Sequence, residues 1–307
     1  MADKIEHHGR QSRRIPDSAA AAQNRRSSAV AQQASSLLVA PVQEGHKREM
    51  SLRPAIFDRQ ARKLRRDRAD PTVLHQLETL IAEALLERLD AVKRLFAGAL
   101  VINTGTGLLA DALIARGIAT EETDFAPGLA RRRSARCCDE DALVAKAQSV
   151  DLVMCPWGLD TVDDLPGALI LARRALRPGG LFLGALAAAP TLPVLRKIIL
   201  TADGDHVVAR THPLIDVRTA GDLLVRAGFA LSVADLEKQT LAYPNFDRLI
   251  ADLRAVGATN VAIDRLSLDR AWFDRARRAF AKLAGTDGRT VETVSLAMLT
   301  GWAPETS

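Results

Sequence analysis

The stretch Ala99-Leu-Val-Ile-Asn-Thr-Gly-Thr-Gly-Leu-Leu-Ala-Asp-Ala-Leu113 decides how the rest of this chain is interpreted. Its pattern predicts a buried strand, a turn that contains Gly105 and Gly107, and the start of a helix. Glycines in such a turn let the backbone approach a ligand, and the free N–H groups of the first helical turn point toward it. The same glycines also suit a plain tight turn, so the stretch by itself leaves a cofactor site and a simple connection equally open.

Strands and helices alternate from this stretch onward. We predict strands at residues 100–103, 119–124, 135–138, 151–155 and 181–186, with helices between them at 108–116, 127–133, 142–147 and 165–176. This order predicts an α/β fold, in which a mostly parallel sheet has helices on both faces. Ligands bind such sheets at the carboxyl ends of the strands, which is where the glycine turn lies.

The last third of the chain has a different pattern. We predict helices at residues 192–202, 219–227, 246–256 and 269–283, an irregular segment at 206–216, and two long strands at 229–243 and 290–302. A late hairpin after five strand–helix units gives a seven-stranded sheet with one antiparallel strand. The helices between the two hairpin strands form a helical insertion at about 244–285.

The composition suits a soluble globular protein. Of the 307 residues 48% are hydrophobic, and no apolar run reaches the ~18 residues that a membrane span needs. The three Cys, of which Cys137 and Cys138 are adjacent, form neither a disulfide framework nor a metal-ligand spacing, so we expect a reducing compartment. Fifteen Lys or Arg against eight Asp or Glu in the first 70 residues indicate a basic arm and no nucleic-acid-binding body.

Residues 1–49 contain no aromatic residue and are rich in Ala, Ser, Gln and Arg. They can bury too little apolar surface to fold, so we interpret them as a disordered N-terminal extension, or as sequence upstream of a true start at Met50. A mitochondrial presequence is a third interpretation, against which the acids Asp3, Glu6 and Asp17 argue.

Residues 50–96 are predicted to form helices ahead of the sheet. The first, near residues 56–70, is basic and carries a thin apolar stripe of Phe57, Ala61 and Leu64. Its arginines form either a solvated face or a contact surface for an anionic ligand or an acidic partner. The second helix, at 71–96, has a wide leucine-rich face and is expected to dock beside the first strand.

The later part of the chain resembles a class I S-adenosylmethionine-dependent methyltransferase, a family with a Rossmann-like fold. The resemblance is carried by the turn Gly105-Thr-Gly107, by Asp124 about 17 residues later, and by Asp139 after the third strand. It is also carried by the helix-to-strand turn Arg173-Arg-Ala-Leu-Arg-Pro-Gly-Gly-Leu-Phe182. It implies that S-adenosylmethionine is the cofactor, that Asp124 accepts both ribose hydroxyls, and that Asp139 meets the adenine amino group. It also sets the bounds of the methyltransferase-like domain at 97–307.

A narrower resemblance runs from about Ile56 to Pro304. The motifs Ile56-Phe-Asp-Arg59, Asp163-Asp-Leu-Pro-Gly-Ala-Leu169 and Leu299-Thr-Gly-Trp-Ala-Pro304 are similar to one subfamily. That subfamily contains the methyltransferase-like assembly factor of mitochondrial respiratory complex I and its alphaproteobacterial relatives. The chain is also similar to the malonyl-carrier-protein methyltransferases of biotin synthesis. The mitochondrial member is associated with hydroxylation of an arginine on a complex I subunit, so the resemblance implies a fold and a pathway more firmly than a reaction.

The glycine loop departs from the family pattern of acid, any, Gly, any, Gly, any, Gly. Those four positions are Val101, Asn103, Gly105 and Gly107 here. The resemblance implies that the acid orients the ammonium end of the cofactor, a contact that Val cannot make. Losing one charge-assisted hydrogen bond costs ~1.5–3 kcal/mol, or about tenfold to a hundredfold in affinity, so this loop is compatible with weak cofactor binding or with none.

The predicted cofactor-binding residues lie in the loop and at the strand ends: Asn103, Gly105, Gly107, Asp124, Asp139 and Cys155. No catalytic residue is identified. Asp160, where relatives carry a His, is expected near the acceptor side, and we favour a solvated loop acid over a general base there. Trp157 and Tyr243 are interpreted as either pocket walls or core residues. His206 and His212 lie on a loop that could act as a lid, and they lack metal-ligand spacing, so no metal is expected.

Three functions are compatible with these residues. The first is a methyltransferase-like enzyme that acts on a protein side chain in complex I assembly, and the second is a non-catalytic assembly factor or chaperone on the same fold. The third is a carrier-protein or small-molecule methyltransferase, in which the basic helix meets an acidic carrier. We expect a cytoplasmic bacterial protein, or a mitochondrial matrix protein if residues 1–49 are a presequence. The acceptor and the oligomeric state are not fixed by the sequence.

Overall fold

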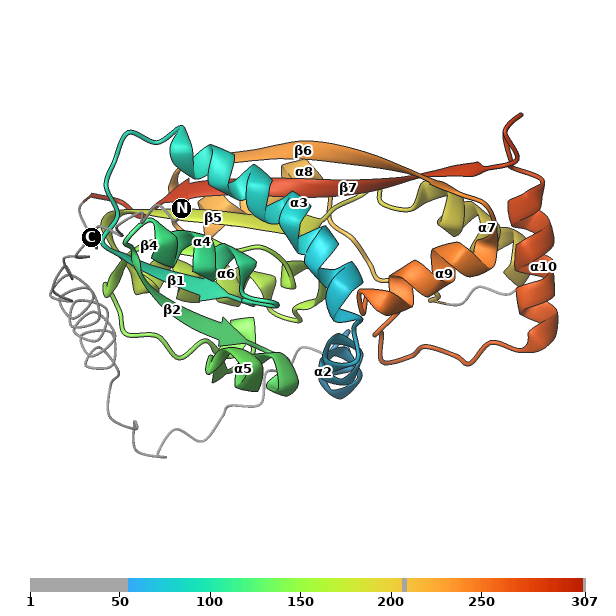
Figure 1. Ribbon diagram of the computed structural model, residues 1–307, viewed down its shortest axis with the longest axis horizontal. Helices are drawn as coiled ribbons and strands as arrows, with labels where there is room; N and C mark the ends of the chain where they lie inside the picture. The colour runs from blue at the N-terminus through green and yellow to red at the C-terminus, as the bar shows by residue number, and fades with distance from the viewer. Residues whose placement is uncertain (1–54, 206–208, 306–307) are drawn as a thin grey trace, which may run out of the picture. The chain divides into compact units, whose positions relative to one another are not determined.

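A seven-stranded sheet organises the chain in a computed structural model that describes residues 55–205 and 209–305 (Figure 1). The strands are β1 (Gly98–Ile102), β2 (Ala119–Asp124), β3 (Arg136–Cys137), β4 (Val150–Cys155), β5 (Leu176–Ala187), β6 (Ala230–Tyr243) and β7 (Thr290–Trp302). Their order is β3-β2-β1-β4-β5-β7-β6. The pairs among β1 to β5 are parallel, whereas β7 runs antiparallel to both β5 and β6. The predicted α/β, Rossmann-like fold is confirmed.

Helices connect the strands as the alternation predicts, with one exception. They are α2 (Arg59–Asp67), α3 (Pro71–Asp90), α4 (Leu108–Ala115), α5 (Pro127–Arg133), α6 (Leu165–Ala175), α7 (Pro193–Asp203), α8 (Val217–Arg226), α9 (Phe246–Ala255) and α10 (Arg270–Ala281), with 3-10 turns η1 (Glu140–Ala142) and η2 (Leu159–Thr161). The helix predicted at 142–147 is wrong. Only η1 forms there, because the chain then extends and carries Leu143 into the core.

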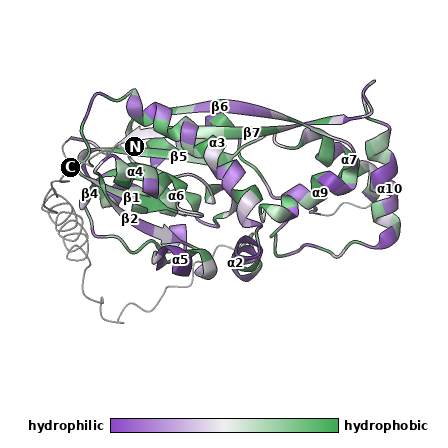
Figure 2. Ribbon diagram, viewed as in Figure 1, coloured by the Kyte–Doolittle hydropathy of each residue, from purple (hydrophilic) through white to green (hydrophobic). Residues whose placement is uncertain are grey.

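Each face of the sheet has its own apolar cluster because side chains alternate along the strands. Leu100 and Ile102 of β1 pack in the cluster that includes α6 and α8. Ala99 and Val101 point the other way, into the cluster that includes α3 and α4. Figure 2 shows the inner strands as mostly hydrophobic, as expected for strands covered on both faces.

Helix α3 docks on the cluster that contains β1, as predicted, through Ile81, Leu85 and Leu89. Leu80 of the predicted apolar face is 51% exposed, while Glu78 is buried on the docked face. The apolar stripe predicted for α2 is wrong in part, since Leu64 is 42% exposed.

The buried residues of α2 are instead two arginines, Arg62 and Arg66. Figure 2 shows this helix as strongly hydrophilic. The face that packs against the rest of the protein is therefore charged rather than apolar. Asp58 caps the helix by accepting the Ala61 N–H at 2.9 Å, and Phe57 just before it forms a single bridge with Ala262. The bridge from Phe57, together with the 2.8 Å bond from the Asp58 N–H to the Val261 carbonyl, holds the start of α2 against the rest of the fold.

A separate cluster lies where β6 and β7 extend toward α7, α9 and α10 (Figure 1). Tyr243 is buried in this cluster with Phe246 and Trp272, so it is a core residue there. No helix among the described residues has the length and apolar character needed to cross a membrane.

Candidate functional site

The glycine loop leaves the carboxyl end of β1 and leads into α4. Asn103, Gly105 and Gly107 have φ values of 61°, 62° and 92°, in the left-handed region that favours glycine and, among other residues, Asn. A Cβ atom at Gly105 would lie 1.9 Å from Oε1 of Glu78, and one at Gly107 would lie 2.1 Å from Cζ of Arg133. The two glycines are therefore required by the backbone conformation, and a side chain at either position would also displace the end of Glu78 or Arg133.

Asp124, the last residue of β2, is tied directly to this loop. Its Oδ2 accepts the Gly105 N–H at 2.9 Å and its Oδ1 accepts the Ala126 N–H at 2.8 Å. The residue is fully buried, and burial raises the pKa of its carboxyl to about 6 despite the nearby charge of Arg66. Strand pairing of β1 and β2 brings the loop and the acid together, as parallel strand ends meet at one edge of a sheet.

Asp139 follows β3 at the same edge and faces α2. It pairs with Lys63 at 3.0 Å and with Arg59 at 3.4 Å. Its neighbour Asp141 pairs with Arg59 as well. The basic residues of α2 thus cover the acids after β3.

Arg62 reaches deepest into this region. Its guanidinium forms a two-pronged contact with Glu140, donates to the Thr161 hydroxyl at 2.9 Å and donates to the Gly158 carbonyl at 2.9 Å. Its Cζ lies 3.6 Å from the centroid of the Phe125 ring, so the planar cation stacks on the residue next to Asp124. Arg62 is 6% exposed and Glu140 is 2% exposed, which makes this a buried ion pair.

Arg66, one turn further along α2, lies beside the glycine loop. Its Cζ lies 3.6 Å from the centroid of the Trp157 ring, and its Nη2 donates to Glu78 Oε1 at 3.1 Å. Burial lowers the pKa of this guanidinium to about 10, so it stays protonated near neutral pH. Two cations therefore lie on two aromatic faces at the carboxyl edge of the sheet.

Asn103 and Cys155 lie together beneath these arginines. The Asn103 amide donates to Glu140 Oε1 and to the Trp157 carbonyl, each at 2.6 Å, and it lies 3.9 Å from Cys155 Sγ. Cys155 is completely buried, and burial raises the pKa of its thiol well above the ordinary value. Within the described residues, Asn103 Oδ1 and Trp157 Nε1 are buried polar atoms that have no hydrogen-bond partner.

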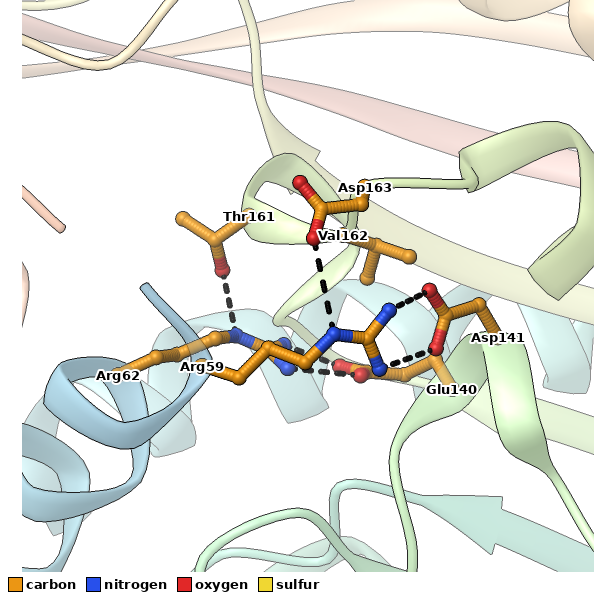
Figure 3. A pocket seen from close by; sticks show the side chains of 7 residues that line it. All are labelled: Arg59, Arg62, Glu140, Asp141, Thr161, Val162 and Asp163. Carbon is orange, nitrogen blue, oxygen red and sulfur yellow. Dashed lines mark hydrogen bonds and ion pairs between the residues drawn. The ribbon is translucent and has the colours of Figure 1, made fainter. Parts of the chain in front are cut away.

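The open space at this site is small. Figure 3 shows Arg59 and Arg62 pointing toward Asp141 and Glu140 across a hollow that is also lined by Thr161, Val162 and Asp163. Its empty volume, which includes space open to solvent, is about 170 Å³, and none of it is an enclosed space that could hold a water-sized molecule. Arg62 and Arg66 of α2 cover the faces of Phe125 and Trp157 beside it.

Two residues singled out in the sequence have other surroundings than expected. Asp160 on η2 is only partly exposed, and burial raises the pKa of its carboxyl, so it is not a solvated loop acid. His212 accepts the Val261 N–H at 2.7 Å through Nε2 and meets the Phe57 ring edge-on.

Across the described residues, no group of three or more His, Cys, Asp and Glu side chains could hold a metal ion.

The structure gathers the six predicted cofactor-binding residues at one edge of the sheet, and Asp124 and Cys155 are completely buried there. Sequence reasoning missed Arg62, Arg66, Glu78, Phe125 and Glu140. A signal was present in α3, because Glu78 follows Leu74 by four residues and precedes Ile81 by three, on the face that docks. A charged residue at such a position requires a specific partner.

The matched family model is that of a methyltransferase domain, over residues 100–184. The chain is 31% identical over 248 residues to malonyl-[acyl-carrier protein] O-methyltransferase of Methylovorus sp., covering 75% of this chain and 83% of that protein. It is 28% identical over 269 residues to the mitochondrial arginine-hydroxylase NDUFAF5 of Danio rerio, covering 82% and 84%. Among solved structures, the YcgJ protein of Bacillus subtilis is similar at 16% identity, with a TM-score of 0.49 over 75% of this chain and 99% of that one.

Proposed function

Because the chain belongs to the class I S-adenosylmethionine-dependent methyltransferase family that contains the malonyl-[acyl-carrier protein] O-methyltransferases, we propose that it binds S-adenosylmethionine at the carboxyl edge of its sheet. One observation carries the proposal. The carboxylate of Asp124 is bonded to the backbone of the glycine loop, which joins the predicted ribose acid and the predicted cofactor loop in one unit. In the proposal, the acid of this unit binds the ribose and its loop lies beside the amino-acid end of the cofactor.

The residues present fit such a cofactor in charge and hydrogen-bonding capacity. Asp124 would hold the ribose hydroxyls and Asp139 the adenine amino group, since carboxylates accept hydrogen bonds from both. The faces of Phe125 and Trp157 bind flat or cationic groups, as the two guanidinium groups that lie on them demonstrate. When bound, S-adenosylmethionine supplies an electrophilic methyl group on its sulfonium.

Binding requires Arg62 and Arg66 to withdraw from those two faces. Such a requirement lowers the apparent affinity by the fraction of molecules in which the site is open. The missing acid at position 101 is one reason for weak binding, because a hydrogen bond to the cofactor is lost. The need to displace Arg62 and Arg66 is a second and independent reason. The same closure favours the second candidate, a non-catalytic assembly factor on the same fold.

For the acceptor, we propose a protein side chain modified during assembly of respiratory complex I. Support comes from the similarity to arginine-hydroxylase NDUFAF5, which extends over 82% of this chain. The third candidate, a carrier-protein methyltransferase, is favoured by 31% identity to the malonyl-[acyl-carrier protein] enzymes. We place the protein in the bacterial cytoplasm in this proposal, with the mitochondrial matrix as the alternative.

Calorimetric titration with S-adenosylmethionine tests the proposal. We expect saturable binding by the full chain, and loss of binding in Asp124→Ala. Asp90→Ala, which removes an exposed acid of α3 paired with Arg116, is the control and should bind like the parent protein. Absence of binding at millimolar ligand would refute the proposal. If binding holds, mass spectrometry of complex I subunits from a deletion strain identifies the acceptor.

A further inference from the structure

Glu78 is a buried acid that reaches the glycine loop from outside the sheet. It lies on the docked face of α3 and is 5% exposed. Its Oε2 accepts the Thr106 N–H at 2.9 Å and also the Thr106 hydroxyl, so the carboxylate is fixed against the loop. Its Oε1 is the atom that a Cβ at Gly105 would strike, so this oxygen faces the middle of the loop.

A carboxylate in such a place needs a cation. Burial raises the pKa of Glu78, and the bonds from Thr106 and the charge of Arg66 oppose that rise. The cation is Arg66, whose Nη2 lies 3.1 Å from Oε1. The structure therefore contains a built cation site, with a carboxylate on one side and the face of Trp157, 3.6 Å from the guanidinium carbon, on another.

Val101, in contrast, has no part in this cation site. Its side chain is fully buried in the apolar cluster with Leu109 and Leu152. The negative charge at the loop is thus supplied by α3, a helix that precedes the sheet. The loop motif could not predict that Glu78 supplies this charge, because Glu78 precedes Gly105 by 27 residues.

We propose that Glu78 is the positioning residue for the ammonium group of the cofactor's amino-acid end, and that Arg66 holds the place of that group until the cofactor binds. The inference rests on the proposed function. S-adenosylmethionine has two cationic groups, and of these only the ammonium can donate hydrogen bonds to Oε1 in the place of Arg66. The exchange replaces one cation by another, so Glu78 stays paired in both states.

Two adenosyl ligands separate this role from a general effect on the site. S-adenosylhomocysteine carries the ammonium group, whereas 5′-methylthioadenosine lacks the whole amino-acid end. Glu78→Gln should weaken binding of S-adenosylhomocysteine by about tenfold to a hundredfold and change binding of methylthioadenosine less than about twofold. Glu83→Gln, at an exposed position of the same helix, is the matched control and should change neither.

Each outcome decides one question. Equal losses for both ligands, or no loss for either, would overturn the role of Glu78 while the proposed function stands. Failure of the parent protein to bind both ligands would overturn the proposed function and the role of Glu78 with it. Thermal unfolding of each variant shows whether it is folded.

Arg66→Met tests the same idea without touching Glu78. Removing the competing cation should tighten binding of S-adenosylhomocysteine relative to methylthioadenosine. Arg65→Met is the control, because Arg65 donates to the carbonyls of Thr259 and Asn260 and not to residues of the loop. An unchanged ratio of the two affinities in Arg66→Met would contradict the proposal.

Discussion

The guanidinium of Arg66 lies 3.6 Å from the centre of the Trp157 ring and 3.1 Å from the carboxylate of Glu78. Together these contacts fill the side of the glycine loop on which a charged ligand group would lie. One turn earlier in α2, the guanidinium of Arg62 likewise lies on the Phe125 ring and pairs with Glu140. The chain's own cations therefore occupy the site, and its acids Glu78 and Glu140 are paired with them.

Arg62→Met should strongly destabilise the protein. The variant leaves Glu140, 2% exposed, without its cation, and breaking a buried pair in this way costs about 3–5 kcal/mol of unfolding free energy. Urea unfolding at pH 7 measures the loss. Arg62→Met with Glu140→Gln should recover part of it, because the uncompensated charge is then gone.

Arg59→Met is the control for that experiment. Arg59 has a side chain 38% exposed, against 6% for Arg62, so its loss should cost less stability than the loss of Arg62. If the Arg62 and Arg59 variants lost equal stability, the buried pair would not hold α2 on the sheet.

Gly105→Ala should cost more stability than Gly117→Ala. Both glycines have positive φ, 62° and 80°, so both variants carry a backbone strain of about 1 kcal/mol. A Cβ at Gly105 also collides with Glu78, which adds roughly 1–3 kcal/mol, whereas Gly117 has open space. Equal midpoints in urea unfolding would show that Glu78 yields freely and is not fixed at the loop.

Binding of methylthioadenosine should strengthen as pH rises from 5 to 7. Burial raises the pKa of Asp124 to about 6, and the ionised carboxylate is the form that accepts two hydroxyls. The ionised fraction rises about tenfold over this interval, and the affinity should follow it. Fluorescence titration at several pH values measures the change, and a flat profile in the parent protein would contradict it. Asp124→Asn should bind weakly with no dependence on pH.

His212 should make the protein less stable in acid. Burial lowers the pKa of its imidazole from 6.5 to about 4, and the neutral Nε2 accepts the Val261 N–H. The unfolded chain then binds the proton more readily, so stability is full above pH 6.5 and is lost as pH falls toward 4. This group alone should remove about 2 kcal/mol between pH 7 and pH 5. His212→Gln should show a smaller loss over that interval in urea unfolding, and an unchanged loss would count against this assignment.

The sheet and the position of its acids could be predicted from the sequence because both depend on local patterns. Asp124 ends a strand, and the parallel order of strands brings it to the glycine loop. The inward face of α2 could not be predicted in the same way. Arg62 and Arg66 look like a solvated face because arginine is rarely buried without a partner. Their partners Glu140 and Glu78 lie 78 and 12 residues away, and only the fold brings them together.

Hydrogen–deuterium exchange with and without S-adenosylmethionine tests the central claim, that the cofactor takes the place of the α2 arginines. Because Arg62 and Arg66 are the buried residues of α2, their displacement should speed exchange of the amides of residues 59–67 when saturating ligand is added. The amides of α10, which packs in the separate cluster with Tyr243, should exchange at the same rate in both conditions. Bound ligand with unchanged or slower exchange in α2 would contradict the claim.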